Sequence, residues 1–106
     1  MPKYLMVGSY TVAGAQGLLK DGGSKRRQVA EAALKSIGGT VESFYFGFGE
    51  DDLYIILDVP DNVSVAAASL AISAAGGFHS KIIVLLTPEE IDQATKKTTS
   101  YQPPGS

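Results

Sequence analysis

The 106-residue sequence contains no cysteine and a single histidine, His79. The absence of cysteine excludes disulfide bonds, thiolate nucleophiles and thiolate metal sites. A serine–histidine–aspartate order with a nucleophile elbow is also missing from the sequence, so the hydrolases built on that motif are disfavoured. The residues therefore indicate a fold more clearly than they indicate a reaction.

Long apolar runs are missing as well. The longest low-charge stretch, residues 63–78, is rich in alanine and serine, whereas a bilayer-spanning helix needs about 20 strongly apolar residues. The first ten residues, MPKYLMVGSY, are too short for a secretory signal and are more typical of a strand. We therefore predict a cytoplasmic protein without a membrane partner.

The sequence has no excess of basic residues. Nine Lys and Arg residues stand against eleven Asp and Glu residues, which gives a net charge of −2 and a pI near 5.2. Nucleic acids and anionic membranes bind basic surfaces, so we expect neither as a partner. The length suits one domain, and a chain of this size buries a modest core that a second subunit would supplement.

The sequence does contain a clear hairpin pattern in residues 40–60, TVESFYFGFGEDDLYIILDVP. Apolar side chains alternate along both arms, which is typical of paired strands. They are Phe44, Phe46 and Phe48 on the first arm, and Leu53, Ile55, Leu57 and Val59 on the second. The turn between the arms, Gly49-Glu50-Asp51-Asp52, holds the densest charge in the chain.

Further elements follow from spacing and from capping residues on either side of this hairpin. We expect strands over residues 3–10 and 78–86, and helices over residues 12–19, 63–75 and 88–96, with Thr11 and Thr87 as helix caps. Another helix is expected to begin at Ser24, after a loop at residues 20–23, and to close at Gly38-Gly39. The small alanines of residues 63–75 would let that helix lie close to a sheet.

This order is β-α-β-β-α-β followed by a terminal helix. It predicts an α+β, ferredoxin-like fold with a four-stranded antiparallel sheet and both helices on one face. We assign residues 1–97 to the domain and residues 98–106 to an extended tail. The tail holds an aromatic residue beside two prolines, and we expect it to dock, with a neighbouring subunit as one candidate surface.

Five segments together resemble the GYD-domain family. They are LLKDGGSKRR at residues 18–27, FYFGFGEDDLY at 44–54, SAAG at 73–76, KIIVLLTPEEID at 81–92 and YQPPG at 101–105. The glycine and the aspartate that give the family its name correspond to Gly49 and Asp52, and Asp51 stands where the family has tyrosine. The resemblance implies a dimeric α+β barrel in which two sheets pack face to face, and it leaves the chemistry open.

Three kinds of side chain could carry chemistry. The turn carboxylates Glu50, Asp51 and Asp52 suit acid–base work, or they are solvated residues that favour a turn. Oxygen ligands of this kind also suit a divalent metal, but no spaced partners complete a site, so we expect no metal and no cofactor. His79 suits proton transfer near neutral pH, or it is a structural or exposed strand residue.

Tyrosines and cations offer binding groups. Tyr4, Tyr10, Tyr45 and Tyr54 could line a pocket for a flat ligand, or they pack between two sheets. Lys25, Arg26 and Arg27 crowd the first turn of a helix, where the helix dipole disfavours cations, so they are either solvated or compensated by an anion. The glycine loop after Lys20 could hold an anion through its N–H groups.

We place a site, if there is one, where residues 20–27 approach the turn at residues 49–52. An arginine there either clamps Asp52 or faces a cavity as an anion-binding group beside Tyr10 or Tyr45. The expected ligand-binding residues are Tyr10, Lys20, Arg26, Arg27, Tyr45, Glu50, Asp52, Tyr54 and His79.

Two classes of function follow. The first is a domain that binds a small molecule in the cavity between helices and sheet, with a cofactor-independent enzyme as its catalytic form. The second is a structural or regulatory homo-oligomer without catalysis. Either class is expected to form a homodimer or a higher assembly.

Overall fold

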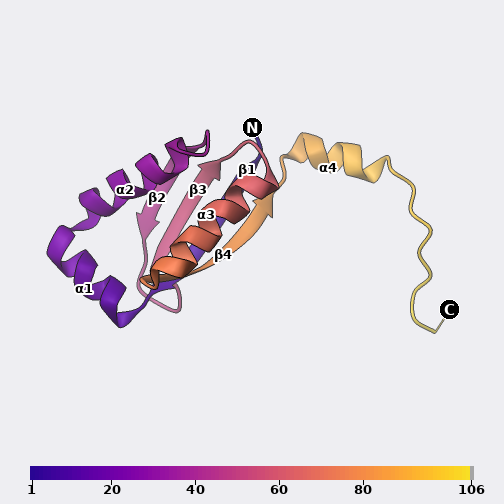
Figure 1. Cartoon of the computed structure of the whole chain (residues 1–106). Coiled ribbons are helices and arrows are strands. Elements are labelled where there is room, and N and C mark those ends of the chain that lie inside the picture. Colours follow the sequence, from indigo (N-terminus) through magenta and orange to yellow (C-terminus); the bar gives the residue numbers. More distant parts are fainter. Residues whose placement is uncertain (106) are drawn as a thin grey trace.

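A computed structural model describes residues 1–105, and its centre is a four-stranded antiparallel sheet in the order β2-β3-β1-β4. The strands are β1 (Lys3–Tyr10), β2 (Thr40–Phe46), β3 (Leu53–Asp58) and β4 (Phe78–Leu85). The helices are α1 (Val12–Asp21), α2 (Gly23–Lys35), α3 (Asn62–Ala75) and α4 (Pro88–Thr95). Figure 1 shows α1, α2 and α3 across one face of this sheet, which confirms the predicted ferredoxin-like α+β fold.

The strand register divides the side chains between the two faces. Tyr4 lies opposite Leu57 and Met6 lies opposite Ile55, and these four side chains are buried beneath the helices. Together with Leu34, Leu53, Val59, Val65 and Phe78 they form the core. The alternation predicted for the hairpin is therefore present, although β2 ends at Phe46 and Phe48 lies fully exposed in the turn.

Glycine allows β1 and the edge strand β4 to approach closely. A Cβ atom at Gly8 would lie 2.0 Å from the backbone oxygen of His79 and 2.6 Å from the ring of Phe78. No rearrangement of a flexible side chain can relieve a contact with backbone at that distance. Gly8 therefore permits Phe78 to cover β1 at the end where the first helix begins.

The junction between α1 and α2 differs from the expected loop. Helix α1 begins after its cap Thr11 as predicted, but it continues through Lys20 and Asp21. Gly22, with φ 82°, is the only non-helical residue before α2 begins at Gly23. The prediction of Ser24 as a cap is wrong because the chain changes direction within this one glycine (Figure 1), which leaves Ser24 inside the first turn of α2.

The predicted glycine cap of α2 is also displaced. The C-cap is Ser36, and Gly38, with φ 77°, forms the turn that follows it. The N–H of Gly39 donates to the carbonyl of Leu34, so the glycine pair still closes the end of the helix. The prediction that the glycine pair closes the helix is confirmed, but the C-cap itself is Ser36, two residues before Gly38.

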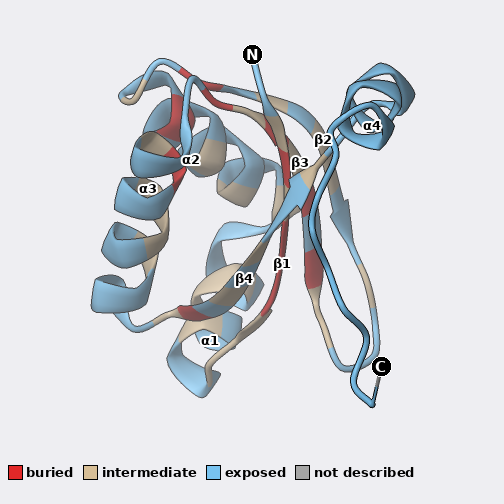
Figure 2. Cartoon of the chain, turned by 90° about the vertical axis from the view of Figure 1, so that its right-hand side faces the viewer, coloured by how far each residue is buried: buried red, intermediate tan, exposed pale blue. Residues whose placement is uncertain are grey.

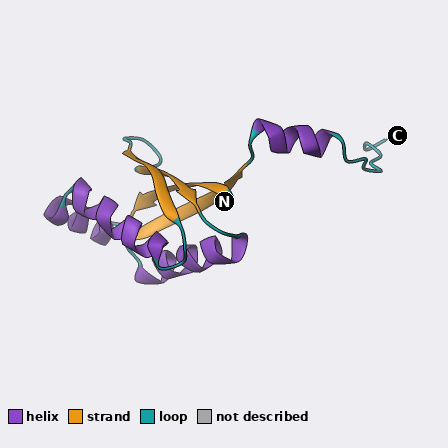
Figure 3. Ribbon diagram, turned by 90° about the horizontal axis from the view of Figure 1, so that it is seen from above, coloured by secondary structure: helices purple, strands orange, loops and turns teal. Residues whose placement is uncertain are grey.

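The C-terminal helix and tail extend away from the body (Figures 1 and 3). Helix α4 has the capping box expected from its sequence, in which Thr87 and Glu90 each accept a backbone N–H. It contains no buried residue. Residues 98–105 of the tail are exposed, its last residue, Ser106, lies outside the described part, and docking of the tail stays a prediction.

The other face of the sheet carries no helix from α1 to α3, as Figure 2 shows from the side. Its apolar side chains, placed by the strand register, are Leu5, Val7, Tyr45, Tyr54, Ile56 and Ile83. We call this surface the open face. Tyr45 is 70% exposed and Ile83 is 47% exposed, so much of its apolar area faces solvent.

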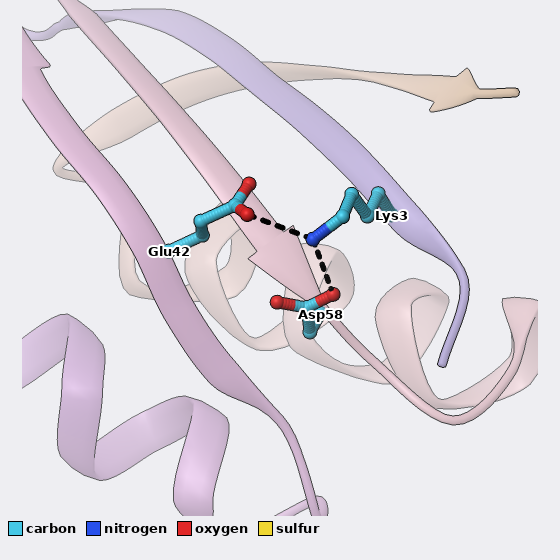
Figure 4. Close-up of polar contacts among 3 residues, drawn as sticks. All are labelled: Lys3, Glu42 and Asp58. Carbon is cyan, nitrogen blue, oxygen red and sulfur yellow. Dashed lines mark hydrogen bonds and ion pairs between the residues drawn. The ribbon is translucent and has the colours of Figure 1, made fainter. Parts of the chain in front are cut away.

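An ionic cluster lies at one end of the open face (Figure 4). The ammonium of Lys3 donates to Glu42 at 2.8 Å and to Asp58 at 3.0 Å. Glu42 is the extra residue of a bulge, since Val41 pairs with Leu57 and Ser43 pairs with Ile56. Both hydrogen bonds raise the pKa of Lys3, and the bond to Glu42 has the larger effect. Nothing in the sequence patterns had pointed to this cluster.

Candidate functional site

A cavity of about 620 Å³ lies between the sheet and the helices. Its floor is the apolar face of the sheet, including Met6, Phe44 and Ile55, and its sides come from α1, α2 and α3. Pockets of about 300–1,000 Å³ with apolar linings and a few polar groups are typical of small-molecule sites. The size and lining of this space are therefore suitable for an organic ligand.

Small side chains create this space. Alanines on α2 and α3 face the cavity, namely Ala30, Ala33, Ala67, Ala68, Ala71 and Ala75. Along α3 the one buried residue is Val65, near its start. As expected, α3 lies against β4 of the sheet, and its alanines leave open the space that longer side chains would fill.

Helix α1 covers one end of the cavity through two glycines. A Cβ atom at Gly14 would lie 1.9 Å from the carbonyl oxygen of Gly77, so α1 touches the turn between α3 and β4 directly. Thr11 strengthens this contact, because its N–H donates to Gly77 and its hydroxyl donates to Gly76. Gly17 lies one turn further along the helix and adds only its backbone to the cavity wall.

The polar end of the cavity contains Tyr10 and Arg26. Tyr10 ends β1 and packs its ring at 5.1 Å from that of Phe78. Burial raises the pKa of the Tyr10 hydroxyl, the nearby Arg26 guanidinium opposes that change, and the Asp52 carboxylate adds a smaller increase. The hydroxyl is therefore protonated at neutral pH and able to donate a hydrogen bond.

Asp52 holds the strand end that carries Tyr10. Its carboxylate accepts the backbone N–H of Tyr10 at 3.0 Å, and its own N–H donates to the carbonyl of Gly8 at 2.8 Å. Asp52 therefore positions Tyr10 through the backbone. The clamp considered for Arg26 and Asp52 is not the pair that forms, because Arg26 lies 3.9 Å from Asp21 instead.

The remaining turn carboxylates lie outside the cavity lining. Glu50 is exposed, and its backbone carbonyl accepts the hydroxyl of Ser9. Asp51 lies 3.7 Å from the ammonium of Lys81 on β4. These contacts fasten the turn to the strands beside it.

The other predicted site residues do not gather at the cavity. Lys20 and Arg27 are exposed on α1 and α2 and are absent from the cavity lining. Tyr45 and Tyr54 pair with each other across β2 and β3 on the open face. His79 lies opposite Ser9 on that same face. The tyrosines are therefore divided between two faces and do not form one pocket.

Sequence reasoning named Arg26 and considered that an arginine faces a cavity, but it missed the alanines and did not distinguish Arg26 from Arg27. The signal was present in α2, since Arg26, Ala30, Ala33 and Ile37 recur at helical spacing and all line the cavity. That spacing separates Arg26 from its neighbours Lys25 and Arg27, which are exposed. Extending the apolar stripe one turn backwards would have selected Arg26 over Arg27 as the residue that lines the cavity.

Residues 1–105 also lack two kinds of feature that would point to a function. Neither histidine nor carboxylates cluster in threes there in a way that could hold a metal ion. No helix in the same range has the length and apolar character needed to cross a membrane.

Comparison with known proteins gives one match. The family model of the GYD domain matches residues 4–95, which include the whole of α1, α2 and α3 and the cavity between them and the sheet. No curated protein and no solved structure matches the chain.

Proposed function

We propose, starting from the fact that the chain belongs to the GYD domain family, that its cavity binds a small apolar molecule. The observation that carries the proposal is the 620 Å³ space that the alanines of α2 and α3 leave above an apolar sheet. A folded chain of this size gains stability by burying apolar surface, so leaving such a surface uncovered has a cost. A ligand that fills the cavity removes this cost.

A neutral fluorescent probe, N-phenyl-1-naphthylamine, tests the proposal. We expect the emission of the probe to rise when the wild-type protein is added. Any molecule that co-purifies, once identified by native mass spectrometry, should displace the probe and lower the emission again. The variant Ala71→Trp places a large ring in the cavity and should abolish the increase, since Ala71 lines the space.

Ala74→Trp is the matched control, because Ala74 is exposed on the same helix and does not belong to the cavity lining. It should bind the probe as the wild type does. A wild type that leaves the probe dark, or equal binding by Ala71→Trp and the wild type, would reject the proposal.

A homo-oligomeric role is the second candidate, and the open face favours it. Soluble monomers rarely expose contiguous apolar patches of several hundred Å². Pairing two copies about a two-fold axis, sheet against sheet, would cover this face on both. This role is compatible with ligand binding, because the cavity lies on the opposite side of the sheet.

A further inference from the structure

We infer that the ligand is an elongated apolar carboxylic acid, with its carboxylate held by Arg26 and Tyr10 and its body lying along α2 and α3. This inference rests on the proposed function and adds the class of ligand to it. It starts from the uneven distribution of polar groups around the cavity.

All the charge on the cavity lining is at one end. Among the side chains of residues 1–105 that line the space, Arg26 is the one that carries a charge at neutral pH, and no carboxylate is among them. Ser36 is polar, but its hydroxyl already donates to the carbonyl of Ala33. A ligand therefore meets a cation at the Tyr10 end and apolar surface elsewhere.

The guanidinium of Arg26 is available for a second partner. Its contact with Asp21 measures 3.9 Å, and both side chains are 36% exposed. An exposed pair at that distance contributes little, whereas a guanidinium has five N–H donors in a planar fork that fits a carboxylate. A ligand carboxylate could take the inward-facing donors while Asp21 remains outside.

Tyr10 and α2 both favour an anion at this position. The Tyr10 hydroxyl can donate to one carboxylate oxygen while Arg26 donates to the other. The first five residues of α2 include Lys25, Arg26 and Arg27 and no acidic residue, and the positive end of the helix dipole adds to their charge. A bound anion reduces this repulsion.

A single negative charge fits better than a double one. Asp21 and Asp52 are the carboxylates close to Arg26 and Tyr10, and they would repel a dianion more strongly than a monoanion. A carboxylate is a monoanion, whereas a phosphate group carries close to two charges at neutral pH. The surroundings therefore select a carboxylate over a phosphate monoester.

The apolar part of the cavity is long. From Arg26 to Leu34 the lining follows α2 over a rise of eight residues, which corresponds to about 12 Å at 1.5 Å per residue. The alanines on both helices leave this length open and line it with apolar methyl groups. An extended hydrocarbon chain or a flat, elongated ring system would match that shape.

The test compares dodecanoic acid with its neutral methyl ester, each below its aggregation concentration, by calorimetry. We expect the wild type to bind the acid at least about tenfold more tightly, the size of effect that one charge-assisted hydrogen bond provides. Arg26→Gln should lose this preference while its affinity for the ester stays unchanged. Tyr10→Phe should retain part of the preference.

Lys35→Gln is the matched control, because it removes one positive charge from the same helix at an exposed position that lies outside the cavity lining. It should keep the preference for the acid. If Arg26→Gln keeps the preference too, or if the wild type binds acid and ester equally, the inference is overturned while the proposed function stands. If the wild type binds neither compound nor the neutral probe, both are overturned.

Discussion

At the scale of single residues, Tyr4 shows how a polar group is accommodated in the core. Its side chain is 1% exposed, and its hydroxyl donates to Oδ1 of Asn62 at 2.6 Å. The bond joins β1 to the first residue of α3. It therefore fixes where α3 starts relative to the sheet, and with it one side of the cavity.

Tyr4→Phe should lower the free energy of unfolding by about 1 kcal/mol, because the ring keeps its packing and only the hydrogen bond is lost. Urea denaturation of both proteins would measure the difference. Tyr45→Phe is the control, since Tyr45 is 70% exposed and the same change there should have little effect. Equal losses in the two variants would contradict this assignment.

At the same scale, the sequence predicted some of the cavity residues correctly and assigned others to the wrong face of the sheet. Tyr10 and Arg26 were named from residue type and position, and both line the cavity. Tyr45, Tyr54 and His79 were named for the same reasons, yet the register places them on the other face. Residue type alone could not distinguish the faces, because both sides of β1 and β3 are apolar.

At the scale of secondary-structure elements, local signals predicted most of the fold. Alternation identified the strands, and threonine and aspartate caps marked the starts of α1, α3 and α4. The cavity could not be predicted in this way. It depends on how far α3 stands from the sheet, which tertiary contacts such as that between Gly14 and Gly77 determine.

The N-cap of α3 gives a prediction that depends on pH. The Asp61 carboxylate accepts the N–H of Ser64 at 2.8 Å, and this hydrogen bond lowers the pKa of Asp61. A carboxyl whose folded pKa is depressed adds stability above its unfolded pKa, and loses that contribution as the pH falls through the folded value. Asp61→Ala should therefore melt at a lower temperature than the wild type at pH 7.

That deficit should shrink as the pH falls below about 4, the ordinary range of an aspartate pKa. Asp61→Asn serves as the control, since asparagine is also a good N-cap and does not titrate. Thermal melts followed by circular dichroism from pH 7 to pH 3 would measure both variants. A deficit that stays constant across this range would show that the charge of Asp61 has no part in the cap.

At the scale of the whole molecule, two features point outward from the body. The open face presents apolar side chains to solvent, and α4 with the following tail projects from the end of β4 (Figure 3). The chain measures 56 × 33 × 23 Å along its principal axes, so this projection makes it elongated. Docking of the projecting segment on a second subunit stays a prediction, as does the predicted dimer.

The open face predicts a dimer whose interface is centred on β3. Tyr54 lies on this central strand, opposite Val7 and Tyr45, and is 41% exposed. Tyr54→Lys would place a charge from each subunit near the two-fold axis, and burying such charges without partners costs several kcal/mol. Sedimentation velocity at micromolar concentration should show a dimer for the wild type and a monomer for Tyr54→Lys.

Leu70→Lys provides the matched control for this experiment, because Leu70 is 71% exposed on α3 and does not line the cavity. It introduces the same charge on the helical side of the sheet and should leave the dimer intact. Loss of the dimer in Leu70→Lys but not in Tyr54→Lys would move the interface to the helices, and a monomeric wild type would remove the sheet-to-sheet dimer altogether. Since the cavity lies on the helical side of the sheet, a dimer formed through the open face would leave it uncovered by the partner in both subunits.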